Sequence, residues 1–134
     1  MKALIIDGGQ AVRSMMGFVL DGEGFKVKQA SGLPEVRYLL DQGYAPDVVI
    51  TCQSRGGADV TALRLLTAHS AMKRVPVILM AEKEDLERQM KWKEAGVTCW
   101  LTWPVTPVRL LEMVRMVLFD FTKEKTGRMA LLNR

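Results

Sequence analysis

The feature that most constrains the fold is a repeated alternation of short apolar runs with amphipathic segments of helical period. Residues 3–6 and 47–52 are nearly continuous apolar runs, typical of strands buried on both faces of a parallel sheet. Between them, apolar residues recur at intervals of three and four, as in helices with one buried stripe. The alternation therefore predicts five strand–helix units, forming a parallel sheet with helices on both faces.

The predicted strands cover residues 3–6, 25–30, 47–52, 75–80 and 98–103. Turn and capping residues delimit the helices: Gly22 and Gly24 end the first, Pro34 opens the second, and Asp59 and Thr106 serve as N-caps of the third and fifth. The fourth helix is predicted over residues 84–95 and is rich in charge. The predicted buried stripes contain Val12, Met15, Met16, Val19 and Leu20, then Val36, Leu39 and Leu40, then Ala62, Leu65, Leu66 and His69, and finally Leu110, Leu111, Val114, Val117, Leu118 and Phe121.

The most apolar strands are the first, third and fourth, and the second alternates between apolar and polar residues. A flavodoxin-like (βα)5 three-layer fold with strand order 2-1-3-4-5 places these apolar strands centrally and the amphipathic ones at the edges. Residues 1–121 are expected to form this single domain. Residues 122–134 are expected to extend the last helix or to form a linker tail.

Composition argues against several other classes of protein. No apolar run reaches the roughly 20 residues of a membrane span, and no signal peptide is recognisable, so a cytoplasmic protein is expected. Two cysteines without a CxxC or Cys/His cluster predict neither a disulfide framework nor a zinc site. The net charge of +4 is scattered, so the sequence does not indicate nucleic-acid binding by this domain.

Several blocks of residues 2–121 resemble the receiver domains of bacterial two-component response regulators. They are LIID, DVVITC before a glycine-rich loop, VPVILM, EAGVTCWLTWP and LLEMVRMVL. The resemblance implies a phosphorylation pocket at the strand ends, and this chain departs from it. Asp7 keeps one acid of the usual pair, and Gly8 stands at the other. The phosphate-accepting aspartate, the hydroxyl residue and the lysine of the family correspond to Cys52, Ala81 and Trp103. The proline that follows the lysine in the family is present as Pro104. The aromatic switch position corresponds to Trp100.

These replacements predict a degenerate, pseudo-receiver type of domain. One carboxylate and a thiol suit magnesium poorly, because that ion prefers several oxygen ligands, so weak or absent magnesium binding is expected. Without the acceptor aspartate, the hydroxyl and the lysine, little remains to stabilise phosphoryl transfer. We expect a non-enzymatic signalling module that acts through protein contacts.

Other interpretations of the same residues stay open. Asp7 could hold an ion, or backbone N–H groups or Arg55 could satisfy it. Cys52 could be a thiol-based sensor or a buried small apolar residue. Trp103 is expected to fill space left in the pocket. A flavin enzyme is the weakest alternative, because no nucleophile–base pair and no flavin-binding loop is recognisable.

The expected partners are other signalling proteins or a covalently linked output domain. The family resemblance implies a contact face on the fourth helix, fifth strand and fifth helix, which could also form a homodimer. Tryptophan and methionine are frequent in binding surfaces. The candidate residues of this face are Trp92, Trp100, Met113 and Met116.

Overall fold

The structure, a computed structural model, describes residues 1–7, 9–52, 60–81 and 86–124, of which 86, 87 and 120–124 are described by their backbone alone. Five parallel strands form one sheet of order β2-β1-β3-β4-β5, as predicted. The strands are β1 (Lys2–Ile6), β2 (Lys26–Ala30), β3 (Val48–Cys52), β4 (Val77–Ala81) and β5 (Cys99–Thr102). The helices are α1 (Gln10–Asp21), α2 (Leu33–Asp41), α3 (Val60–Ala68), the short 3-10 helix η1 (Ser70–Met72), α4 (Leu86–Glu94) and α5 (Pro107–Glu124).

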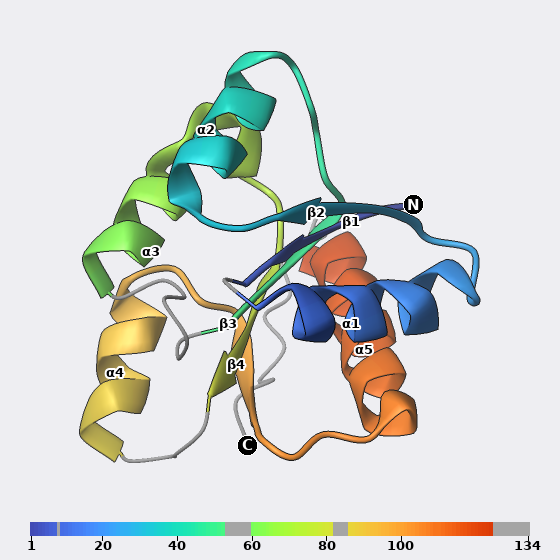
Figure 1. The fold of residues 1–134 in the computed structure, drawn as a ribbon. Helices are drawn as coiled ribbons and strands as arrows, with labels where there is room; N and C mark the ends of the chain where they lie inside the picture. The colour runs from blue at the N-terminus through green and yellow to red at the C-terminus, as the bar shows by residue number, and fades with distance from the viewer. Residues whose placement is uncertain (8, 53–59, 82–85, 125–134) are drawn as a thin grey trace.

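The fold has three layers. Helices α1 and α5 cover one face of the sheet, and α2, α3 and α4 cover the other (Figure 1). Strands β3 and β4 are buried along their whole length, whereas β2 is largely exposed and β5 alternates, which confirms the prediction of central and edge strands. The flavodoxin-like architecture predicted from the sequence is therefore confirmed.

Local sequence signals set several element boundaries. Helix α1 is followed by the C-cap Gly22, and Gly24 adopts a φ of +90°. The Thr106 hydroxyl accepts a hydrogen bond from the Arg109 N–H at 3.1 Å, which confirms Thr106 as the N-cap of α5. The predicted cap Asp59 lies outside the described residues.

Two predicted helix faces are wrong in part. On α3, the predicted Leu66 is buried, but its buried partner is Leu63, and the predicted Leu65 is 60% exposed. On α1, Met15 is exposed although Met16 and Leu20 are buried. Both helices carry more apolar residues than the sheet can cover. The spacing of these residues therefore does not identify which of them are buried.

The turn from α4 to β5 is tightly packed on α3. Gly96 has a φ of +98°, and a Cβ added there would lie 2.8 Å from three side-chain atoms of Thr67. The Thr67 hydroxyl donates a hydrogen bond to the Ala95 carbonyl at 2.7 Å. Only glycine combines this backbone conformation with so close an approach, so the turn holds β5 at a fixed distance from α3.

Candidate functional site

The carboxyl edge of the sheet brings together several of the predicted site residues. Asp7 directly follows β1, Cys52 ends β3 and Ala81 ends β4. The register pairs Ile6 with Thr51 and Cys52 with Met80, so Asp7 comes at the level of Cys52 on the neighbouring strand. Gly8 lies outside the described residues. Edges of this kind are where parallel α/β sheets place their binding sites.

Asp7 is a fully buried carboxylate with incomplete hydrogen bonding. Its Oδ2 accepts a hydrogen bond from the Gly9 N–H at 3.1 Å, and its Oδ1 is buried without a hydrogen-bond partner. The guanidinium of Arg13 donates to the Asp7 backbone carbonyl and not to the carboxylate. One backbone N–H therefore bonds to one oxygen of Asp7, and Arg55, the other partner considered, lies outside the described residues.

The two positions that would carry an acceptor and a hydroxyl are apolar in this chain. Cys52 is 1% exposed and belongs to the hydrophobic cluster between the sheet and helices α1 and α5. Ala81 is fully buried in the cluster on the opposite face, beside α3 and α4. Both side chains therefore serve as packing surface and present no oxygen to this edge.

Trp103 is half-buried and packs against the same cluster as Cys52. With Met15, Met16 and Met80 it lines a small cavity at the start of α5. The backbone N–H of Trp103 donates a hydrogen bond to the Ala81 carbonyl at 2.8 Å. The peptide bond from Trp103 to the exposed Pro104 is cis. A bulky apolar side chain thus stands where the family resemblance implies a lysine.

The residues present do not fit a magnesium ion well. Among the described side chains at this edge, Asp7 alone offers carboxylate oxygens, and one of them already accepts a hydrogen bond. The described part of the chain contains no group of three or more His, Cys, Asp or Glu side chains arranged to hold a metal. Magnesium prefers six oxygen ligands, so a single carboxylate beside a buried thiol is a poor site for it.

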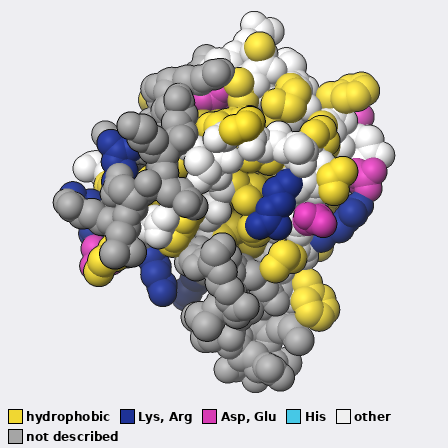
Figure 2. Space-filling model, turned by 90° about the horizontal axis from the view of Figure 1, so that it is seen from below, with side chains coloured by type: hydrophobic (Ala, Val, Ile, Leu, Met, Phe, Trp, Pro, Cys, Tyr) yellow, Lys and Arg dark blue, Asp and Glu magenta, His cyan; other side chains and the backbone are white. Residues whose placement is uncertain are grey.

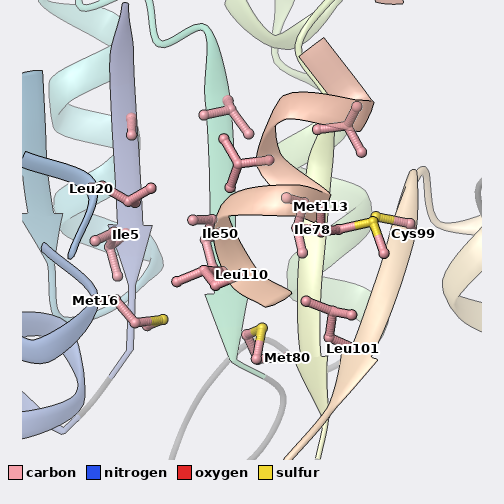
Figure 3. Packing of buried hydrophobic residues seen from close by; sticks show 14 of the residues in the cluster. Ile5, Met16, Leu20, Ile50, Ile78, Met80, Cys99, Leu101, Leu110 and Met113 are labelled. Atoms are coloured by element: carbon pink, nitrogen blue, oxygen red, sulfur yellow. The ribbon is translucent and has the colours of Figure 1, made fainter. Parts of the chain in front are cut away.

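The candidate contact face changes once burial is known. Trp92 is 1% exposed and meets Trp100 edge to face, with ring centroids 5.7 Å apart. Met113 is 4% exposed and packs in the core near Ile78 and Cys99 (Figure 3). The prediction that Trp92 and Met113 contribute to a contact surface is therefore wrong, because the monomer already buries both side chains.

Two members of the predicted face keep accessible surface. Met116 is 45% exposed, and Trp100 is partly buried. Trp100 borders a hollow of about 380 Å³ that is also lined by Pro104, Val105 and Arg109. Elsewhere on α1 and α5 the exposed large apolar side chains are Met15, Phe18, Val108 and Phe119. Figure 2 shows hydrophobic side chains spread among charged ones on the face seen from below.

Neither Cys52 nor Cys99 forms a disulfide, and both are buried. Cys52 ends β3 and Cys99 begins β5, so their positions along parallel strands keep the sulfurs apart. Burial raises the pKa of the Cys99 thiol to about 12, and the nearby Arg109 opposes this only in part. Cys99 is therefore a protonated, unreactive thiol at neutral pH.

One feature of the surface had no signal in the sequence. A groove of about 380 Å³ lies between α2 and α3, away from the carboxyl-edge residues described above. His69, predicted on the buried stripe of the third helix, is partly buried at one end of this groove. It hydrogen-bonds to Asp41, which lies 28 residues earlier in the chain. Such a long-range pair has no periodicity by which to predict it.

No protein-family model matches the chain. It is 20% identical over 117 residues to the phosphate regulon transcriptional regulatory protein PhoB of Klebsiella pneumoniae and, equally, to PhoB of Escherichia coli. Those residues are 87% of this chain and 51% of the relative, so the chain spans about half the length of the curated relatives it matches.

Solved structures share the whole architecture. The chemotaxis response regulator CheY4 of Vibrio cholerae is 24% identical with a TM-score of 0.78, covering 87% of this chain and 97% of that one. A CheY-like receiver domain protein of Methanospirillum hungatei is 22% identical with a TM-score of 0.79, covering 92% and 97%. Among the described residues no helix is both long and apolar enough to cross a bilayer. Strand order and structural similarity together show that this chain has the CheY-like fold.

Proposed function

We propose that this domain is a pseudo-receiver: a signalling module of a two-component or phosphorelay system that does not accept phosphate on aspartate. The observation that carries the proposal is the residue at the end of β3. There the family resemblance implies a phosphate-accepting aspartate, and this chain has Cys52, 1% exposed in a hydrophobic cluster. A thiol in that position cannot form an acyl phosphate.

The neighbouring replacements support the same conclusion. Phosphoryl transfer needs fixed positive charge and hydrogen-bond donors around the transferred oxygens. Ala81 has no hydroxyl, and Trp103 replaces a cationic side chain with an apolar one that packs against the core. The loss of one acid and the loss of the lysine are mutually consistent, since a pair of carboxylates left without a lysine would bury unbalanced negative charge.

The proposed mode of action is contact with other proteins. The partner is either a covalently linked output domain, as the greater length of the PhoB relatives suggests, or a separate signalling protein. Two accessible features lie on β5 and α5: the hollow that Trp100 and Arg109 line, and the exposed Met116. Partly exposed tryptophan and methionine side chains suit a docking partner or a second copy of the chain.

The test is direct. The full chain is incubated with magnesium and acetyl phosphate and its intact mass is measured, while beryllofluoride with magnesium is followed by tryptophan fluorescence. We expect no added phosphoryl group and no saturable fluorescence change. A stoichiometric acyl phosphate, or tight magnesium binding, would contradict the proposal.

The alternative proposal, a thiol sensor at Cys52, has less support. Reactivity requires a thiolate, which forms in an accessible and electropositive environment. Cys52 is buried in an apolar cluster, with the Asp7 carboxylate next to it along the sheet edge. Modification by iodoacetamide at neutral pH, located by peptide mapping, decides the matter: a rate above that of an ordinary free thiol would favour the sensor.

A further inference from the structure

The groove between α2 and α3 has an apolar lining. Leu33, Val36 and Leu40 come from α2, and Leu65 and Leu66 come from α3. Its volume of about 380 Å³ falls within the range of small-molecule sites, roughly 300–1,000 Å³. Leu65 is 60% exposed at the groove, so an occupant would bury apolar surface that the protein itself leaves in water.

One end of the groove carries fixed polar groups. The His69 Nδ1 accepts a hydrogen bond from the Ala71 N–H at 3.1 Å, and its Nε2 lies 2.8 Å from Asp41 Oδ1. Because Nδ1 acts as the acceptor, Nε2 carries the proton and donates a hydrogen bond to the Asp41 carboxylate. Both ring nitrogens of His69 are hydrogen-bonded. The His69–Asp41 pair therefore has a fixed orientation and links the ends of α2 and α3.

Arg37 is the cationic group of the groove that remains available. Its Nε lies 4.0 Å from Asp41 Oδ2, which is too long for a hydrogen bond, and its side chain is 76% exposed. A guanidinium has five N–H donors arranged to match the two oxygens of a carboxylate. Asp41 Oδ1 is bonded to His69 and its Oδ2 is ion-paired with the Nε side of Arg37, so the terminal N–H groups of the guanidinium remain for an occupant.

We propose that this groove binds a small amphiphilic molecule, with an apolar body on the leucines and one carboxylate or similar oxyanion held by Arg37. The lining residues are separate from Asp7, Cys52, Ala81 and Trp103, so this proposal is independent of the pseudo-receiver function. A cationic head group would compete with Arg37 and His69 for the Asp41 carboxylate and is disfavoured.

Sodium octanoate and octan-1-ol provide a matched pair of probes, since they share an apolar chain and differ in the carboxylate. Each is titrated into the full chain while the leucine methyl groups are followed by NMR. We expect octanoate to shift the methyl signals of groove leucines saturably, and octanol to bind about two- to fivefold more weakly, as for an exposed ion pair.

Substitutions identify the groups responsible. Arg37→Gln is expected to bring octanoate down to the affinity of octanol. Leu65→Glu is expected to abolish binding of both probes. Arg64→Gln removes an equivalent exposed charge from α3 outside the lining and is expected to change nothing. Unchanged groove methyl signals at saturating probe would overturn the proposal. Equal binding of both probes to the wild type, or equal losses in Arg37→Gln and Arg64→Gln, would overturn the role of Arg37.

Discussion

Substituting Gly96 by alanine should destabilise the domain through two separable effects. Gly96 has a φ of +98°, in the left-handed region where an L side chain costs about 1–2 kcal/mol. The added Cβ would also lie 2.8 Å from Cβ, Cγ2 and Oγ1 of Thr67. Overpacking of this kind costs about 1–3 kcal/mol. Gly96→Ala should therefore lower the free energy of unfolding by about 2–5 kcal/mol.

Thr67 cannot easily move aside to relieve the clash. Its one O–H is shared between the Ala95 carbonyl of the α4–β5 turn, at 2.7 Å, and the Leu63 carbonyl within α3, at 3.0 Å. A shift of the side chain that relieves the contact would also break the bond to the Ala95 carbonyl. The expected loss is therefore a property of the packing between α3 and this turn.

Gly24 provides the matched control. Its φ of +90° is nearly the same, but a Cβ there would meet nothing within 4 Å. Gly24→Ala should show the backbone cost alone, about 1–2 kcal/mol, and the change in unfolded-state entropy is common to both variants. Urea unfolding followed by circular dichroism measures both. Equal destabilisation by the two substitutions would refute the close contact with Thr67.

Three further predictions concern burial and charge. Met113→Ala should cost about 2–5 kcal/mol because Met113 is in the core, whereas Met116→Ala should change stability by no more than about 0.5 kcal/mol, both measured by urea unfolding. The raised pKa of Cys99, about 12, gives a stability contribution complete below about pH 8.5 and lost as pH rises towards 12, so Cys99→Ala should flatten the alkaline decline in unfolding free energy. If the exposed surface of α5 around Met116 docks a second copy, Met116→Glu should reduce dimerisation in light scattering, while Tyr38→Glu, on the exposed surface of α2, should not.

The sequence was sufficient to predict the order of elements because each central strand is an unbroken apolar run. The alternation of strands and helices then leaves few topologies. The carboxyl-edge positions followed from the same alignment of strand ends, which is why Asp7, Cys52 and Ala81 could be placed from the order of residues alone. It was harder to predict whether a residue is buried or exposed where tertiary packing does not follow the local helical pattern.

Met113 and Trp92 illustrate that limit. The buried arc of α5 is wider than one stripe, because the helix packs over several strands at once and reaches Cys99 on the edge strand β5. Helix α4 is highly charged, yet its one tryptophan packs in the cluster that α3, β4 and β5 form beneath it. Both outcomes depend on which elements cover the residue, and helical periodicity carries no information about that.

The absence of phosphorylation on aspartate is tested most directly by comparing the wild type with a variant whose pocket residues are restored. Gly8→Asp, Cys52→Asp, Ala81→Thr and Trp103→Lys together reintroduce the side chains that the family resemblance implies. Both proteins, checked for folding by circular dichroism, are incubated with acetyl phosphate and magnesium and weighed by intact mass spectrometry. We expect one phosphoryl group on the restored variant and none on the wild type. Phosphorylation of the wild type on an aspartate would contradict this expectation.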